Sequence, residues 1–305
     1  MLALLAILLA QQDWQELAAA FKRIDPGRLA LALLLMFVSR TAVAVRWHAL
    51  LRQTRTPIRL GQSLRVTYAG LFSSNFLPTT IGGDVVRLFG AVQIGINAAS
   101  ATASLVMDRL VGMAGMALLL PISFTRLAQT DFQSLFQLPA SFKNKYATSF
   151  APLLNWLRLS MEKTRNFIQR TIADMSLWLK HPGSLVISLA FTLIHQVALY
   201  TAIWLLLDGM GEPIGWLQIG GIWSFVYFVT LLPISINGYG LQELSATLLY
   251  SRMGGISIEA SITLALLVRT LTILVSLPGA LSAIQFMTMS RKDTQLQPSG
   301  SDHDK

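Results

Sequence analysis

Apolar segments long enough to cross a bilayer are the feature that most constrains what this chain can fold into. Four such segments occupy residues 29–51, 98–124, 185–207 and 256–289. A helix needs about 20 apolar residues to cross the hydrocarbon core. Backbone N–H and C=O groups at that depth must be satisfied within the segment itself, which favours helices over single strands. We therefore predict an all-α fold, a polytopic membrane helical bundle.

The composition supports a membrane location. Hydrophobic residues make up 53% of the chain and charged residues only 13%, with a mean hydropathy of +0.55, whereas soluble domains carry about 25% charged residues. The formal net charge of +9 comes from basic residues between the apolar segments. Such residues hold loops against anionic lipid, so we expect membrane lipids as partners and no nucleic acid. The chain has no cysteine, which excludes disulfide scaffolds, thiolate metal sites and thiol nucleophiles.

The apolar segments predict a single transmembrane domain over residues 1–290, followed by a polar tail over residues 291–305. Two repeat halves, at about 29–124 and 185–289, are linked by a basic amphipathic segment over residues 125–183. The apolar stretch at the N-terminus predicts a short first helix, because ten helical residues rise only about 15 Å. This stretch also lacks the basic start of a signal peptide.

Arginines set the orientation of the first loop. Arg46 and Trp47 lie near the end of the segment at residues 29–51, where Trp47 is suited to anchor the helix at the membrane interface. The loop that follows contains no acidic residue and four arginines: Arg52, Arg55, Arg59 and Arg65. The positive-inside rule places this loop in the cytoplasm. We expect a multi-pass protein of the bacterial cytoplasmic (inner) membrane.

Two apolar segments, residues 66–89 and 217–250, are interrupted by Pro and Gly and resemble each other, since residues 77–83 align with residues 232–238. Paired interruptions in two halves indicate a transporter's binding site. A break inside the bilayer exposes backbone N–H groups and helix ends that can hold a charged group. The alternative is that Pro and Gly only kink packed helices. We predict two broken or re-entrant segments related by an internal repeat.

Ionisable residues at membrane depth indicate the substrate. Eight are found: Arg40, Asp84, Arg87, Asp108, Arg109, His195, Glu243 and Arg269. Each costs about 2.5–3.5 kcal/mol on insertion scales, so a purely decorative role is excluded. Asp84 and Arg87 would share a face of a helix, whereas the adjacent Asp108 and Arg109 point apart and are expected to pair with other helices. Four arginines against three acids leave a cationic surplus that suits an anionic headgroup.

Structural roles are the alternative at several of these positions. Arg40 could snorkel or form a structural pair, and a lone His195 is typical of a hydrogen-bonded core residue. Asp108 and Arg109 could equally form a structural connection between helices. The candidate substrate-binding residues are Asn75, Pro78, Gly82, Gly83, Asp84, Arg87, Asp108, Arg109, Pro233, Asn237, Gly238, Glu243 and Arg269. We expect the first break, with Arg87, to engage a headgroup phosphate. The second break, with Glu243, would hold a cationic moiety or exchange a proton.

Arg46-Trp47 and three longer motifs that follow it in order resemble the flippase-like membrane family that includes the N-terminal half of lysylphosphatidylglycerol synthase. The longer motifs are Asn75-Phe76-Leu77-Pro78-x3-Gly82-Gly83-Asp84-x2-Arg87, Met107-Asp108-Arg109-Leu110-x-Gly112 and Pro233-x4-Gly238-x-Gly240-x2-Glu243. The resemblance covers about residues 29–289 and implies a multi-helix membrane domain that moves lipids between leaflets. The chain departs from the pattern at Asn237, where a Gly is usual, and at Gln242, where an Arg is usual.

Two other classes of function compete with a lipid translocase. One is a membrane enzyme acting on a lipid phosphate or polyprenyl carrier, with Asp84, Asp108 and Glu243 as metal ligands or as an acid/base pair. The other is a partner protein of a membrane glycosyltransferase. We find no HExxH, GxSxG or P-loop motif and no soluble aminoacyl-transferase domain, so we expect a non-enzyme without a cofactor. The sequence leaves open a homo-oligomer or a lipid-modifying enzyme partner.

Overall fold

A computed structural model of the chain describes residues 24–54, 56, 58–75, 82–121, 182–231 and 241–283. All regular structure in these ranges is helical, so the prediction of an all-α fold is confirmed. Four predicted site residues lie outside the described residues: Pro78, Pro233, Asn237 and Gly238. The predicted short first helix, the amphipathic linker and the polar tail lie outside them as well.

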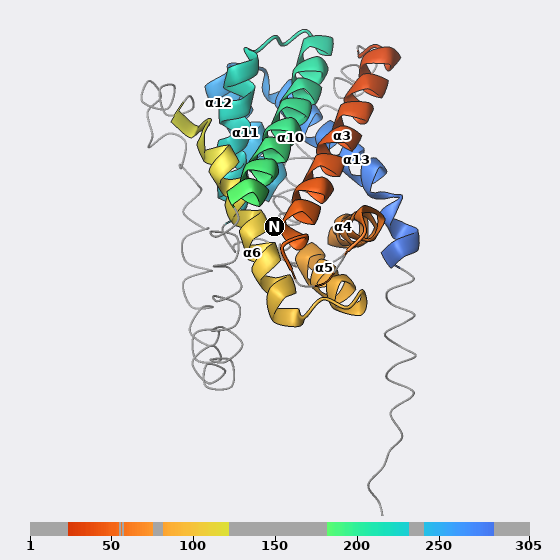
Figure 1. Cartoon of the computed structure of the whole chain (residues 1–305). Coiled ribbons are helices and arrows are strands. Elements are labelled where there is room, and N and C mark those ends of the chain that lie inside the picture. The colour runs from red at the N-terminus through yellow and green to blue at the C-terminus, as the bar shows by residue number, and fades with distance from the viewer. Residues whose placement is uncertain are drawn as a thin grey trace, which may run out of the picture.

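The described helices fall into two sets with the same order of lengths (Figure 1). The first set is α3 (Pro26–Leu51), α4 (Leu60–Ser74), α5 (Gly82–Gln93) and α6 (Ala98–Ala117). The second is α10 (Pro182–Gly209), α11 (Trp216–Thr230), α12 (Leu241–Gly254) and α13 (Ile258–Ser276). In each set, two long helices enclose two short ones. This order agrees with an internal repeat, which itself stays a prediction.

Each interrupted segment forms two short helices that pack against each other, α4 with α5 and α11 with α12. The longest of the four has 15 residues and rises about 22 Å, which is less than the roughly 30 Å of a hydrocarbon core. The segments are therefore broken, as the sequence predicts. Whether they re-enter or jointly span the bilayer stays a prediction.

Three of the described helices, α3, α10 and α13, are long and apolar enough to cross a membrane. Helix α6 has 20 residues but is not among them, and its interior contains the adjacent charges Asp108 and Arg109. The predicted crossing by residues 98–124 therefore stays a prediction.

Local sequence fixes where several helices begin. The Asp25 side chain accepts a hydrogen bond from the backbone N–H of Arg28 at 3.1 Å, and Pro26 opens α3. Asn97 caps α6 in the same way through the N–H of Ala99 at 2.9 Å. Such caps satisfy N–H groups that have no partner within the helix.

Helices α3 and α10 pack side by side along the middle of the bundle and run antiparallel (Figure 1). Arg28, at the start of α3, pairs with Asp208, at the end of α10, at 2.5 Å. Halfway along, the Ser39 hydroxyl and His195 Nδ1 are 2.6 Å apart. The apolar core extends from the middle and far end of α10 into α11, α12 and α13. The pair therefore joins the two sets of helices.

Candidate functional site

Five charged residues of the first set form a continuous chain of ion pairs, which we name the ion network: Arg46, Asp84, Arg87, Asp108 and Arg109. Asp108 of α6 accepts hydrogen bonds from Arg46 Nε at 2.7 Å and from Arg87 Nη2 at 3.0 Å. Asp84 accepts from Arg87 Nη1 at 3.1 Å and from Arg109 Nε at 2.5 Å. Three helices, α3, α5 and α6, are thereby joined through their charged side chains.

The ion network is buried at one end and open at the other. The side chains of Asp108 and Arg87 are 2% and 9% exposed, whereas that of Arg109 is 37% exposed. Asp84 lies in the first turn of α5, where the partial positive charge of a helix N-terminus favours an acid. Every carboxylate oxygen of Asp84 and Asp108 thus has a guanidinium partner. Buried charges need such pairing to be tolerated.

Trp47 and two glycines shape the space around the ion network. The Arg87 guanidinium lies 4.4 Å from the centre of the Trp47 ring, a distance at which the ring face attracts a cation. Trp47 Nε1 in turn donates to the Ser104 hydroxyl at 3.1 Å. A Cβ at Gly70 would lie 2.7 Å from Arg87 Cγ, and one at Gly112 would lie 3.1 Å from an Arg46 guanidinium nitrogen. A side chain at Gly70 would therefore collide with Arg87, and one at Gly112 would require the Arg46 guanidinium to shift by a few tenths of an ångström.

The sequence-predicted pairings are confirmed for this half. Asp84 and Arg87 pair within α5, while the adjacent Asp108 and Arg109 pair with other helices. Gly82 and Gly83 open α5, and a Cβ at Gly83 would lie 2.9 Å from the Gly70 carbonyl oxygen. The sequence reasoning missed Arg46, since its position before an arginine-rich loop indicates an interfacial charge. The sequence feature that could have indicated its buried role is its position beside Trp47, within the apolar helix.

A second group of polar and charged side chains gathers against one face of α13. It consists of Arg269 and Thr272 of α13, Arg40 of α3 and Glu243 of α12, and we name it the α13 cluster. Glu243 Oε1 of α12 is 3.9 Å from Arg269 Nε, a loose ion pair. Arg40 of α3 donates from Nη2 to the Thr272 hydroxyl at 3.4 Å. Arg40 Nε is buried and has no hydrogen-bond partner among the described residues. The described part of this region therefore contains two cations, Arg40 and Arg269, and one anion, Glu243.

Asn75 connects the first break to the same helix face. It is the C-cap residue of α4, and its side-chain amide donates to the Ser276 hydroxyl of α13 at 2.9 Å. Thr272 lies three residues after Arg269, and Ser276 lies four residues after Thr272. Residues at these spacings lie on the same face of a helix, so the three form one stripe along α13. The structure thus brings Asn75, Glu243 and Arg269 to α13, and collects Asp84, Arg87, Asp108 and Arg109 elsewhere.

Two further expectations concern His195 and metals. His195 is 6% exposed and contacts both the hydroxyl and the carbonyl oxygen of Ser39, which agrees with the structural interpretation of this residue. In the described part of the chain, no group of three or more His, Asp or Glu could hold a metal ion. The candidate site there consists of arginines, carboxylates, hydroxyls and an amide, a set suited to binding anionic and zwitterionic groups.

Fold and site together define an integral membrane protein with charged side chains buried between its helices. The chain belongs to the family described as lysylphosphatidylglycerol synthase TM region, whose model matches residues 1–279. The expected family is therefore confirmed, and with it the membrane location. A comparison with curated proteins found no match.

Proposed function

We propose that this protein moves an anionic or aminoacylated phospholipid, or a lipid-linked substrate, between the leaflets of the bacterial inner membrane. The observation that carries the proposal is the composition of the α13 cluster. Two guanidinium groups face one carboxylate there, and the ion pair is 3.9 Å long. A phosphate group would add a negative charge beside these two cations and accept hydrogen bonds from Arg40.

The energetic argument rests on burial. The side chains of Arg269 and Glu243 are 17% and 10% exposed, and the Nε atom of Arg40 is buried. A surplus cation at membrane depth is costly, and it marks substrate or ion pathways in membrane proteins. Arginine stays charged when desolvated and presents a planar fork that matches phosphate oxygens. The cost of the surplus is offset once an anionic headgroup enters.

The carboxylate gives the cluster a second capacity. Glu243 lies in the first turn of α12 and is close enough to Arg269 to stabilise it without a short hydrogen bond. An aminoacylated headgroup carries ammonium groups beside its phosphate. Glu243 would accept an ammonium while the arginines hold the phosphate, so one cluster would bind both ends of a zwitterionic headgroup.

The proposed path follows from where the broken segments lie. Asn75 ties the end of α4 to α13, and Glu243 lies at the start of α12. One helix of each short-helix pair, α4 or α12, therefore packs against α13 at or beside the cluster. Small movements of these pairs would expose it to one side of the membrane and then to the other, while the acyl chains stay in lipid. Transporters with paired broken helices use this geometry.

The rival enzyme proposal draws less support. Its three acids would have to gather at one reacting centre, but Asp84 and Asp108 belong to the ion network and Glu243 belongs to the α13 cluster. Both aspartates are already engaged by arginines. We therefore propose a non-enzymatic transporter, and a lipid-modifying enzyme partner stays a prediction.

The test is leaflet exchange of fluorescent lipids in proteoliposomes. Phosphatidylglycerol, its lysyl derivative, phosphatidylcholine and a polyprenyl phosphate are compared in wild type, Arg40→Gln and Glu243→Gln. We expect exchange to be faster for phosphatidylglycerol, its lysyl derivative and the polyprenyl phosphate than for phosphatidylcholine, and to be lost with Arg40→Gln. We expect Glu243→Gln to slow the aminoacylated lipid most. Arg28→Gln is the matched control, since it removes an arginine from the exposed start of the same helix.

Equal traces from wild type and empty liposomes for every lipid would overturn the proposal. Exchange that persists unchanged in Arg40→Gln and Glu243→Gln would place the path away from the α13 cluster.

A further inference from the structure

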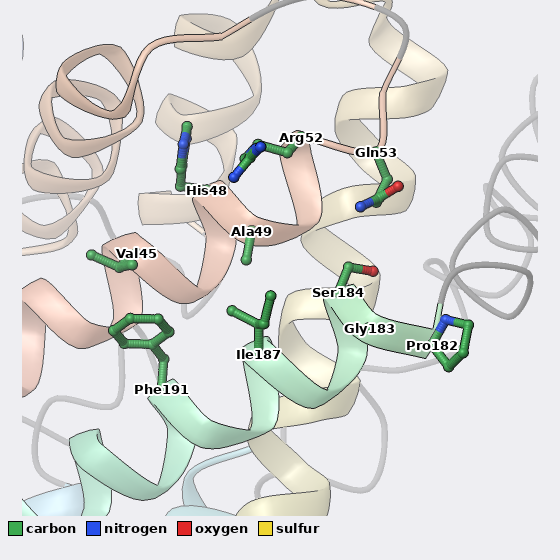
Figure 2. A pocket seen from close by; sticks show the side chains of 10 residues that line it. All are labelled: Val45, His48, Ala49, Arg52, Gln53, Pro182, Gly183, Ser184, Ile187 and Phe191. Atoms are coloured by element: carbon green, nitrogen blue, oxygen red, sulfur yellow. The ribbon is translucent and has the colours of Figure 1, made fainter.

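A groove of about 600 Å³ opens between the last turns of α3 and the first turns of α10 (Figure 2). It lies away from the α13 cluster, and none of the sequence-predicted site residues lines it. Its volume falls within the range of about 300–1,000 Å³ that ligand pockets occupy. The space is sufficient for a small polar headgroup and the upper part of one acyl chain.

Polarity changes along the groove. Toward the middle of the two helices, Val45, Ile187 and Phe191 project into the groove. Toward the helix ends, Gln53 lies across from Ser184, and the Arg52 side chain extends toward His48 (Figure 2). Ile187 is 49% exposed, as befits a side chain that faces lipid. Because α3 and α10 are long and apolar enough to cross a membrane, we place their ends at the membrane surface and their middles in hydrocarbon. The groove thus has the polarity of a membrane lipid, with the polar part outermost.

The polar part of the groove is cationic. Among the described residues that line it, Arg52 and His48 are ionisable and none is acidic. Arg59 and Arg65 lie on the next segment, and both are exposed. Clusters of arginine beside a membrane helix attract anionic lipids. A zwitterionic lipid would gain less from this surface, since its headgroup bears a compensating cation.

We propose that this groove binds one anionic glycerophospholipid, with its phosphate at Arg52 and an acyl chain along Val45, Ile187 and Phe191. The lipid would rest against the α3–α10 pair that joins the two sets of helices. The proposal concerns binding and does not depend on transport, so it stands or falls separately from the proposed translocation through the α13 cluster.

The absence of cysteine from the sequence makes a direct test practical. Ala49, which lines the groove, is changed to cysteine in the full chain, giving a single reporter thiol. The protein is placed in vesicles of phosphatidylcholine, alone or mixed in equal amounts with phosphatidylglycerol. The rate of alkylation by a neutral, water-soluble maleimide is measured. Gly61→Cys is the control thiol, because it is exposed at the start of α4 with open space around it.

We expect phosphatidylglycerol to slow alkylation of Ala49→Cys more than that of Gly61→Cys. The control corrects for the lower thiolate content of any thiol near an anionic surface. Adding Arg52→Gln should weaken the lipid's apparent affinity about fivefold, the effect of one cationic side chain at such a surface. Arg65→Gln removes an exposed arginine outside the groove and should leave the protection of Ala49→Cys in place.

Equal protection by both vesicle types would overturn the proposal, as would equal effects of Arg52→Gln and Arg65→Gln. Both arginines are exposed, so neither variant threatens folding. Protection of Ala49→Cys in a protein that shows no leaflet exchange would confirm the groove while removing the translocase proposal.

Discussion

The two halves of the bundle each place an acid in the first turn of a short helix and an arginine in the next long helix. In the first half, Asp84 and Arg109 are joined at 2.5 Å. In the second half, Glu243 and Arg269 are 3.9 Å apart. The same kind of pair is therefore tight in one half and loose in the other.

The neighbouring residues explain the difference. Three positions after Asp84 stands Arg87, whereas three positions after Glu243 stands Ala246; Asp108 precedes Arg109, whereas Val268 precedes Arg269. The first half thus contains the extra ions that complete a network, and the second half has small or apolar side chains instead. A completed network stabilises the fold. A looser pair, such as Glu243 with Arg269, holds its two charges less tightly and suits the headgroup site that we propose.

The largest expected effect is on the stability of the ion network. Asp108→Ala would leave Arg46 and Arg87 buried without their shared carboxylate. We expect a loss of about 3–5 kcal/mol in the free energy of unfolding, typical of breaking a buried pair from one side. Denaturant unfolding in detergent micelles measures this. A variant as stable as wild type would show that the ion network is not a structural element.

In the second half, we expect a substitution to affect lipid exchange more than stability. Glu243→Gln should slow exchange of an aminoacylated lipid about tenfold or more, the effect of losing a charged hydrogen-bond partner. The free energy of unfolding should change by less than that of Asp108→Ala, because the ion pair it removes is long, at 3.9 Å, and Asp108 holds two arginines. Leaflet exchange and unfolding measured on one preparation test both. A large loss of stability without a loss of exchange would reverse the roles assigned to the two halves.

A smaller loss of stability is expected from a side chain added at Gly112, which packs against Arg46. Gly112→Ala would place a Cβ 3.1 Å from the Arg46 guanidinium and should cost about 1–3 kcal/mol of stability, as overpacking does. Gly61→Ala is the matched control, since nothing lies within 4 Å of its Cβ position. That variant should be neutral or slightly stabilising. Equal unfolding midpoints for the two variants would contradict the close packing around Arg46.

The smallest effect is expected at the exposed end of the α3–α10 pair. The side chains of Arg28 and Asp208 are 42% and 35% exposed, and exposed ion pairs contribute about 0–1 kcal/mol. Arg28→Gln should change the unfolding midpoint little, and added salt should reduce the difference further. A loss comparable to that of Asp108→Ala would show that burial does not separate these two ion pairs.

Much of the fold could be predicted from sequence because membrane-spanning helices are recognised by their length and hydropathy. Three of the four predicted spans correspond to α3, α10 and α13, and the Pro/Gly breaks fall between the paired short helices. The pairing of Asp84 with Arg87 follows from helical spacing alone. Caps such as Asp25 and Asn97 also have a readable local signature.

The partners across the bundle could not be predicted, because they depend on how helices far apart in sequence pack. Nothing in the pattern around Arg40 points to Thr272, or around Asn75 to Ser276. Arg46 was missed for the same reason, since its role depends on Asp108 of another helix. The expectation that Arg87 holds a phosphate stays a prediction; in the structure its Nη atoms donate to Asp84 and Asp108.

The two charged groups draw their residues from different parts of the chain, and this has a consequence for membrane insertion. All five residues of the ion network lie on α3, α5 and α6, so the first half can pair both carboxylates with its own three arginines as it leaves the ribosome. Arg40 differs, because its hydrogen-bond partner Thr272 lies on α13, at the far end of the chain. During membrane insertion, Arg40 can form its hydrogen bond to Thr272 only after α13 has been inserted. Correct assembly is thus completed at the same residues that we propose as the headgroup site.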